Sequence, residues 1–306
     1  MKVLVATEKP FANAAVDGIR DVIDKAGYEL MLLEGYTDRQ ELLTAVKDAD
    51  ALIVRSDKIN DEVISAANKL KIVVRAGAGY DNIDLEACTS KNIVAMNTPG
   101  QNSNAVAELA FGMMVYLARG GFNGKPGTEL RDKTLGIHAF GNVGKYVAKI
   151  AQGFGMKVFA FDPFIEIADI EKDGVEAVNT VEELYSRCQY ISLHIPSTAE
   201  TKASIGYELL SSMPAGAVLV NTARKEVINE EELLKVFKDR GDFSYISDIA
   251  PDCREDIESH YEGRYFFTPK KMGAQTAEAN INSGLAAAGQ IVRFLEKGDE
   301  TFRVNK

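Results

Sequence analysis

The chain has 306 residues with 45 acidic and 35 basic side chains, which gives a formal charge of −10. It holds no run of five or more Lys or Arg, and both facts argue against a nucleic acid partner. A hydrophobic content of 46% suffices for a sizeable core in one or two domains, which excludes a disordered chain. The three cysteines lie far apart without a CxxC pair, so we expect no disulfide framework, no metal site and a reducing compartment.

Met1 leads directly into strand-like residues 2–6, without a signal-peptide pattern. No apolar run approaches the ~18 residues that a membrane span needs. We therefore expect a soluble, cytoplasmic protein.

Short β-rich runs alternate with segments of helical period, which predicts an α/β protein with parallel sheets covered by helices. The predicted strands form two sets, 3–6, 51–54, 72–74 and 93–95, then 135–139, 158–161, 190–193, 218–220 and 245–247. A long helix is predicted over 104–118, and the Gly- and Pro-rich loop 120–127 after it indicates a boundary. The last helix, 276–296, is too apolar on one face to stand alone, so we expect it to pack back on the body.

A glycine turn follows the strand at 134–139 and precedes a helix predicted over 145–154. Gly141 would let the backbone approach a pyrophosphate, and Gly144 would permit close packing of the helix. The helix N-terminus offers N–H donors to an anion, and Asn142 and Val143 in the turn are further candidate cofactor contacts. This pattern is typical of a dinucleotide-binding turn.

Two residues qualify that interpretation. Ala139 stands where such a fingerprint has its first glycine, which weakens the pattern. Asp162 lies eighteen residues past Gly144 at the end of the next strand, where a carboxylate accepts hydrogen bonds from a ribose diol and repels a 2′-phosphate. Asp162 therefore favours NAD over NADP. An ordinary tight turn beside an unrelated aspartate is the alternative.

Four further motifs follow in order: Ser192–Pro196, Val220–Arg224, Ser247–Ala250 and Thr268–Glu278. In this order and spacing they resemble the D-2-hydroxyacid dehydrogenase family over nearly the whole chain. Three earlier motifs are similar to its phosphoglycerate dehydrogenase branch: Ile53–Ser56, Val74–Asp84 and Met96–Gly100.

The resemblance implies two doubly wound, Rossmann-like domains with the active site in the cleft between them. Residues 1–100 with 278–306 would form the substrate-binding domain, and 101–277 the NAD-binding domain. The resemblance also implies a homodimer with the helix at 104–118 near its interface. The chain stops at Lys306, so we expect no regulatory ACT-type domain. The connection from Arg119 to Thr134 is short for the family, which leaves the crossing between the domains open.

Oxidation of a secondary alcohol needs a hydride acceptor, a base and a cation that fixes the carboxylate. Arg224 matches the family's catalytic arginine, whose planar fork can bind a carboxylate through two hydrogen bonds. Most relatives use a histidine paired with a glutamate as the acid/base. Here Lys271 stands at the histidine position, and Cys253, with Asp252 beside it, stands at the glutamate position.

A lysine needs no glutamate to select a tautomer. A desolvated site beside Arg224 would lower the pKa of Lys271 from ~10.4 toward the working range. Three alternatives stay open: Lys270 as the base, His260 moving into the site, or an inactive site.

The resemblance assigns further contacts. Asp248 matches the residue that contacts the nicotinamide carboxamide, and His194 would abut the cofactor. The other implied cofactor contacts are Pro196, Thr222, Ala223, Gly273 and Ala274. Arg55 and Arg75 each follow an apolar strand and suit a phosphate, with Ser56 beside them, while the backbone at Ala76 and Gly77 would bind the carboxylate. His138 is expected to be a packed core histidine.

These residues predict NAD-dependent oxidation of 3-phosphoglycerate to 3-phosphohydroxypyruvate, the first step of phosphorylated serine biosynthesis. One alternative is another D-2-hydroxyacid dehydrogenase, such as a glyoxylate or hydroxypyruvate reductase. The other is a non-enzymatic, NAD-sensing protein similar to the corepressors of this fold.

Overall fold

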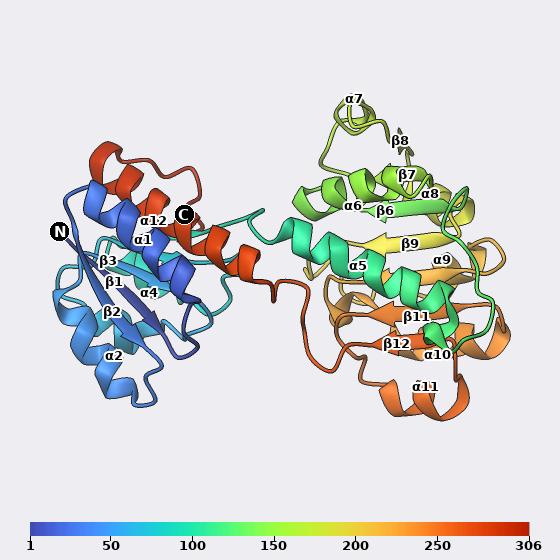
Figure 1. Ribbon diagram of the computed structural model, residues 1–306, viewed down its shortest axis with the longest axis horizontal. Helices are drawn as coiled ribbons and strands as arrows, with labels where there is room; N and C mark the ends of the chain where they lie inside the picture. Colours follow the sequence, from blue (N-terminus) through green and yellow to red (C-terminus); the bar gives the residue numbers. More distant parts are fainter. Residues whose placement is uncertain (306) are drawn as a thin grey trace. The chain divides into compact units, whose positions relative to one another are not determined.

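The computed structural model describes residues 1–305 as two compact units. The first comprises Met1–Asn102 together with the C-terminal segment from Gln275, and the second comprises Ser103–Ala274. Each has one parallel sheet with helices on both faces, as predicted (Figure 1). The loop at 120–127 lies inside the second unit rather than at its boundary, because the helix before it packs within that unit.

The first unit has a five-stranded sheet in the order β2-β1-β3-β4-β5. Its strands are β1 (Lys2–Thr7), β2 (Glu29–Glu34), β3 (Ala51–Val54), β4 (Ile72–Arg75) and β5 (Val94–Asn97). Its helices are α1 (Asn13–Lys25), α2 (Arg39–Ala45), η1 (Val46–Asp48), α3 (Asp61–Ala66), α4 (Leu85–Ser90) and α12 (Ala277–Lys297). Alternate residues of β1 face two separate cores, so both faces of the sheet are buried.

The C-terminal helix α12 packs against α1 in the first unit, which confirms that it returns to the body (Figure 1). Two glycines bring the helices close together. A Cβ at Gly18 would lie 2.7 Å from Leu285 Cδ2, and one at Gly284 would lie 2.9 Å from Ile19 Cδ1. The apolar face of α12 is thereby buried.

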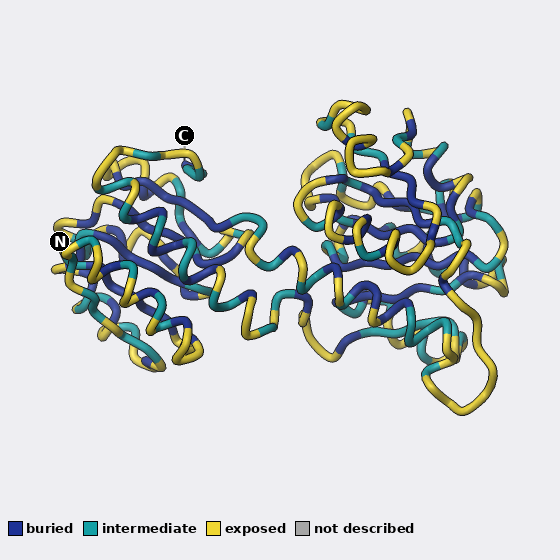
Figure 2. Tube along the Cα trace, turned by 45° about the horizontal axis from the view of Figure 1, so that its top comes forward, coloured by how far each residue is buried: buried dark blue, intermediate teal, exposed yellow. Residues whose placement is uncertain are grey.

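The second unit has a seven-stranded sheet in the order β12-β11-β10-β9-β6-β7-β8. Its strands are β6 (Thr134–His138), β7 (Lys157–Phe161), β8 (Glu176–Ala177), β9 (Tyr190–Leu193), β10 (Val218–Asn221), β11 (Ser244–Ser247) and β12 (Tyr265–Phe267). The helical elements are α5 (Ser103–Ala118), η2 (Gly120–Phe122), α6 (Asn142–Gly153), α7 (Ile167–Glu171), α8 (Val181–Arg187), α9 (Tyr207–Ser212), η3 (Lys225–Val227), α10 (Glu230–Asp239) and α11 (Arg254–His260). The central strands β6, β9 and β10 are buried, and Figure 2 shows buried segments in dark blue.

The connection between α5 and β6 turns back along the end of its own helix. The N–H of Thr128 donates to the carbonyl of Ala118 over 2.8 Å. This short connection therefore stays within the second unit.

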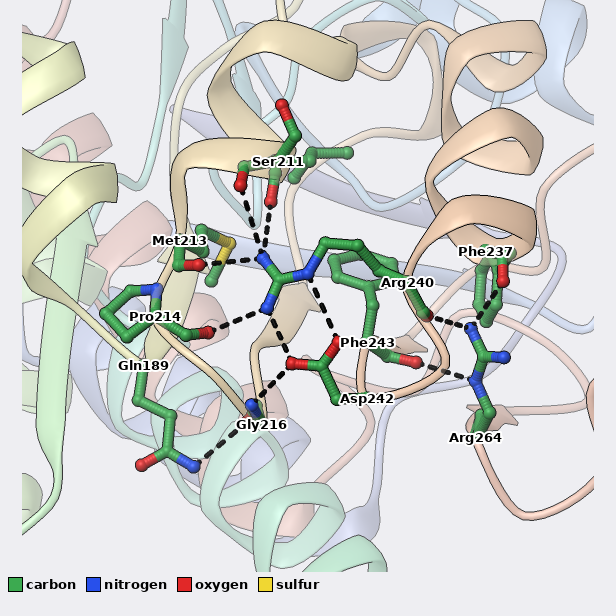
Figure 3. A network of polar contacts seen from close by, with 11 residues as sticks. Gln189, Ser211, Met213, Pro214, Gly216, Phe237, Arg240, Asp242, Phe243 and Arg264 are labelled. Atoms are coloured by element: carbon green, nitrogen blue, oxygen red, sulfur yellow. Dashed lines mark hydrogen bonds and ion pairs between the residues drawn. The ribbon is translucent and has the colours of Figure 1, made fainter.

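An arginine network stabilises the amino-terminal edge of this sheet, at the loops that lead into β10, β11 and β12 (Figure 3). Arg240 donates to the carbonyls of Met213 and Pro214 over 2.7 and 2.9 Å and pairs with Asp242. The hydrogen bond from Arg240 lowers the pKa of Asp242 to about 2. Arg264 donates to the carbonyl of Phe243 over 2.9 Å. This edge is occupied by structural contacts, and the polar residues of the predicted site lie at the opposite, carboxyl-terminal edge.

Within residues 1–305, no helix is long and apolar enough to cross a membrane. The same part of the chain holds no group of three or more His, Cys, Asp or Glu that could bind a metal ion.

Candidate active site

The second unit changes direction between β6 and β9. The chain runs from β6 to β7 on one side and later returns to β9 on the other. The N–H of His194, just past β9, donates to the carbonyl of His138 at the end of β6 over 2.9 Å. In open parallel sheets, ligands bind outside the carboxyl ends of strands at such a switch point.

The glycine turn lies at this position. Helix α6 begins at Asn142, three residues earlier than predicted, and Gly141 precedes it with an extended backbone. A Cβ at Gly144 would lie 2.5 Å from the carbonyl oxygen of Ala139, so only glycine allows this approach of helix to strand. A Cβ at Gly141 would meet nothing within 4 Å. The backbone is therefore open on the side where an anion can approach the helix N-terminus.

Ala139 has a φ of 80°, in the left-handed region that glycine normally occupies. Its N–H donates to the carbonyl of Phe161, the last residue of β7, over 2.9 Å. The backbone thus keeps the glycine conformation of the fingerprint although the residue is alanine.

Asp162 supports the same turn from the end of β7. Its carboxylate accepts hydrogen bonds from the N–H groups of Phe140 over 2.8 Å and of Phe164 over 2.9 Å. Each oxygen has one acceptor position left for a ribose hydroxyl. The side chain of Phe164 is 93% exposed beside this carboxylate.

Two neutral histidines lie at the switch point. His138 is buried, and its Nδ1 lies 3.3 Å from the hydroxyl of Tyr185, as expected of a packed core histidine. Burial lowers the pKa of His138 to about 4. Burial and the neighbouring His138 lower the pKa of His194 to about 3, and its Nε2 pairs with the hydroxyl of Ser192 over 2.9 Å. Both rings are therefore uncharged near neutral pH.

The end of β10 carries an unsatisfied hydroxyl. The Oγ1 of Thr222 is buried and has no hydrogen-bond partner among residues 1–305. A buried polar atom without a partner is costly, so it fits a position that a ligand completes. Together with the open backbone at Gly141, this unpaired hydroxyl fits the binding of a dinucleotide by this unit.

Two cations meet just after β10. The carbonyl oxygen of Ala223 accepts hydrogen bonds from Lys271 Nζ over 3.3 Å and from Arg224 Nη1 over 3.0 Å. Both side chains are exposed. Their placement brings a proton-carrying ammonium beside a planar guanidinium, which is the pair that a 2-hydroxy or 2-oxo acid needs.

Asp248 holds the loop that carries Lys271. Its carboxylate is almost fully buried and accepts from the N–H groups of Met272 over 2.7 Å and Gly273 over 2.8 Å. It also accepts from the hydroxyl of Thr268 over 3.1 Å. A Cβ at Gly273 would lie 2.9 Å from Asp248 Oδ2, so glycine is required there. Within the chain, Asp248 binds this loop, and its contact with the nicotinamide carboxamide stays a prediction.

Three other candidates, Pro196, His260 and Lys270, are exposed. Pro196 is exposed, and its carbonyl accepts from the hydroxyl of Thr201. His260 is the last residue of α11, and its Nδ1 pairs with the carbonyl of Asp256 in the same helix. Lys270 lies next to Lys271 on the loop and is exposed.

The pair at the expected glutamate position offers no free carboxylate. Burial, with Glu230 nearby, raises the pKa of Cys253 to about 12, so its thiol stays protonated. Asp252 is paired with Lys225.

In the first unit, Arg55 lies at the switch point between β1 and β3. Its guanidinium donates to the carbonyls of Lys9 and Pro10 over 2.9 and 3.0 Å, and to the side chain of Asn280 over 2.6 Å. It also lies 5.1 Å from the ring centroid of Phe11. These contacts connect the loop after β1 to α12.

Arg75 lies beside Arg55 at the end of the neighbouring strand, and its Nε donates to the carbonyl of Arg55 over 3.0 Å. Its guanidinium covers Gly77, where φ is 149° and a Cβ would overlap Arg75 Nη1. Ser56 is exposed and Ala76 is buried next to them. The two predicted arginines and the Ala76–Gly77 backbone are thus brought together in one unit.

Sequence reasoning missed the polar residues that shape this site. Asn221 and Thr268 bind backbone groups around Arg224 and Lys271. Both lie within motifs that the sequence analysis singled out, directly at or after a strand end. Their position at the carboxyl end of a predicted parallel strand could have indicated that they belong to the site.

The chain was compared with known proteins. Residues 105–257 match the family described as "D-isomer specific 2-hydroxyacid dehydrogenase, NAD binding domain". The D-3-phosphoglycerate dehydrogenase of Methanocaldococcus jannaschii is 37% identical over 289 residues, which cover 90% of this chain and 55% of that protein. The chain thus spans about half the length of that relative. The hydroxypyruvate reductase of Thermotoga maritima is 34% identical, covering 90% of this chain and 97% of that protein.

Among solved structures, the NAD+-bound 3-phosphoglycerate dehydrogenase of Entamoeba histolytica is 52% identical, with a TM-score of 0.87. The match covers 100% of this chain and 99% of that one.

Proposed function

The chain belongs to the D-isomer-specific 2-hydroxyacid dehydrogenase family, and from this premise we propose that it is an NAD-dependent dehydrogenase that interconverts 3-phosphoglycerate and 3-phosphohydroxypyruvate. The observation that carries the proposal is the convergence of Lys271 and Arg224 on the carbonyl of Ala223. This places an acid/base next to a carboxylate-binding cation. The similarity to phosphoglycerate dehydrogenases supports the choice of substrate.

The residues of the second unit would share the chemical work. NAD, when bound, supplies the hydride acceptor. Arg224 would bind the substrate carboxylate and polarise the C2 oxygen through its planar fork. Lys271 would take the proton of the C2 hydroxyl in oxidation and return it in reduction. The pyrophosphate would accept hydrogen bonds from the backbone N–H groups of Gly141, Asn142 and Val143. The buried hydroxyl of Thr222 would form a hydrogen bond with the cofactor.

The remaining assignments follow the same proposal. Ala76 and Gly77 would bind the substrate from the first unit, and Arg55, Ser56 and Arg75 would receive its phosphate. The other cofactor contacts would come from Gly144, Asp162, His194, Pro196, Ala223, Asp248, Gly273 and Ala274. Residues 1–100 with 278–306 would therefore form the substrate-binding domain and 101–277 the NAD-binding domain.

The activity is tested by following NADH absorbance with 3-phosphohydroxypyruvate as substrate. Lys271→Met should abolish turnover and leave NADH binding nearly intact, because the ammonium carries the proton. Lys270→Met is the matched control on the same loop and should keep turnover, as should His260→Ala. Loss of turnover in a control, with Lys271→Met active, would overturn the acid/base assignment.

The substrate is tested by Arg55→Met, Arg75→Met and their combination. The double variant should raise the KM for 3-phosphohydroxypyruvate by orders of magnitude and spare an unphosphorylated 2-oxo acid. An unchanged KM for the phosphorylated acid would refute the choice of substrate.

A hydroxypyruvate reductase is the second candidate, supported by the relative in Thermotoga maritima, which the chain covers almost completely. Comparison of kcat/KM for hydroxypyruvate and 3-phosphohydroxypyruvate decides between them. An NAD-sensing binding protein would bind NADH and oxidise none of it with either acid.

We further propose a cytoplasmic homodimer. The three free cysteines suit a reducing compartment. Phe122, just after α5, exposes 66% of its surface although it packs edge-on against Tyr116. An apolar ring so exposed fits a contact with a second copy. Sedimentation should give a dimer that Phe122→Asp weakens, and a monomeric wild type would refute this.

A further inference from the structure

The two predicted catalytic cations share one backbone oxygen as a hydrogen-bond acceptor. Lys271 Nζ and Arg224 Nη1 both donate to the carbonyl of Ala223. The two side chains come from loops after different strands, β12 and β10. The orientation of the Ala223 peptide group therefore contributes to their relative position.

A single buried side chain binds the peptide groups on both sides of the Ala223 peptide group. Asn221, the last residue of β10, is only 2% exposed. Its Oδ1 accepts from the N–H of Ala223 over 2.9 Å, and its Nδ2 donates to the carbonyl of Arg224 over 2.9 Å. The amide thus closes the turn on both sides of the Ala223 carbonyl. Its Nδ2 also lies 3.2 Å from the hydroxyl of the buried Tyr245.

The main chain of Asn221 is held as firmly as its side chain. Its carbonyl accepts from the N–H of Asp248 over 3.0 Å and from the hydroxyl of Ser247 over 3.1 Å. Asp248 in turn binds the N–H groups of Met272 and Gly273, which follow Lys271. The backbone of the lysine loop and the acceptor of the lysine ammonium are therefore anchored at neighbouring strand ends.

We propose that Asn221 is the positioning residue for Lys271, holding the Ala223 carbonyl so that the ammonium stays beside the guanidinium of Arg224. This role rests on the proposed function, in which Lys271 is the acid/base. The amide does the work that a carboxylate partner would do for a histidine. A neutral amide suits a lysine, because it orients the backbone acceptor without adding a second charge to the site.

The positioning is tested by the accessibility of the two neighbouring lysines, without any need for turnover. The whole protein is treated with trace acetic anhydride, and acetylation at Lys270 and Lys271 is compared by mass spectrometry. Both side chains are exposed, so they are matched. Lys271 should react several-fold more slowly than Lys270 because its ammonium is hydrogen-bonded. Equal rates in the wild-type protein would overturn the inference, whether or not any variant folds.

The variant is Asn221→Ala, which removes both hydrogen bonds to the turn and adds no charge. It should bring the Lys271 rate close to that of Lys270. Tyr245→Phe is the control, because it removes one partner of Asn221 but leaves the bonds to Ala223 and Arg224. The control should keep the wild-type contrast between the two lysines. An unchanged contrast in folded Asn221→Ala would also overturn the inference.

Kinetics separate positioning from general support. Asn221→Ala should lower kcat roughly 10- to 100-fold, as expected for losing one or two buried hydrogen bonds, with KM and NADH affinity within about threefold. A fall in kcat together with a rise in KM and weaker NADH binding would indicate a structural role instead. If the wild type shows the lysine contrast but no turnover with 2-oxo acids, the proposed function fails and the positioning stands. If the wild type turns over 2-oxo acids but shows no contrast between the two lysines, the positioning role fails and the proposed function stands.

Discussion

Three glycines around α6 give a matched set of substitutions with different expected effects. A Cβ at Gly144 would lie 2.5 Å from the carbonyl oxygen of Ala139 and 3.1 Å from Ile137 Cγ2. A Cβ at Gly141 or Gly153 would meet nothing within 4 Å. The same chemical change, one methyl group, therefore tests packing at the first position, ligand approach at the second and helix propensity at the third.

The magnitudes follow from these surroundings. Gly144→Ala must push α6 away from β6, and overpacking of this kind costs roughly 1–3 kcal/mol, or several degrees of melting temperature. Gly153 is the last residue of α6, so Gly153→Ala should stabilise the protein by at most about 0.5 kcal/mol. Gly141→Ala should leave stability nearly unchanged. It should weaken NAD binding roughly 10- to 100-fold, since a methyl group there obstructs a charge-assisted hydrogen bond to the pyrophosphate.

Thermal unfolding of the ligand-free protein measures the first effect, and titration with NADH measures the second. NAD should raise the melting temperature of Gly153→Ala as it does for the wild type, and should raise that of Gly141→Ala much less. Equal melting temperatures for the variants at 144 and 153 would show that the close approach of helix and strand is not limiting. Wild-type NADH affinity in Gly141→Ala would refute the pyrophosphate site.

Other residues of the second unit give three further predictions. Burial lowers the pKa of His138 from 6.5 to about 4, so the unfolded chain binds the proton more readily between these values. Between pH 7 and pH 5, stability should therefore fall by roughly 2 kcal/mol through His138 and by about as much again through His194, in urea titrations. His138→Gln should remove about half of this slope, and an unchanged slope would contradict the prediction. Because φ at Ala139 is 80°, Ala139→Val should cost at least about 1–2 kcal/mol, whereas Ala139→Gly should stay within about 1 kcal/mol of the wild type in the same titration. Asp162→Ala should weaken NAD binding and reduce discrimination against NADP in calorimetric titrations, and an unchanged preference would argue against its ribose role.

Much of the fold could be predicted because the central strands are buried on both faces. The strands β3 and β9 have the predicted bounds: β3 is a continuous apolar run, and β9 is apolar except for Ser192. Edge strands lack that signal. The strand β2 begins and ends with glutamate and is partly exposed along its length, and β8 has only two residues. Neither was predicted. The early start of α6 was also missed, because Asn142, Val143 and Gly144 were interpreted as part of the turn.

The sequence could predict which strand ends carry the candidate site residues. It could not predict which groups those residues contact. Arg224 and Asp248 were each predicted in a motif at a strand end, and the carboxyl ends of parallel strands meet at one edge. Which groups their neighbours bind depends on register. Asn221 pairs with Ser247 across β10 and β11, and this register brings the N–H of Asp248 to the carbonyl of Asn221. No local pattern contains that information.

Arg55 illustrates the same limit and has a consequence for substrate binding. A sequence places an arginine at a strand end, but it does not say whether the guanidinium faces a ligand or the protein. Three N–H groups of Arg55 are donated to the chain itself, and Arg75 is held by the Arg55 carbonyl. A phosphate would therefore meet two guanidiniums that are already ordered, which reduces the entropy lost on binding. The same contacts connect the loop after β1 to α12, so replacing Arg55 should affect both stability and KM. Replacing Arg75 should separate the phosphate contribution more cleanly.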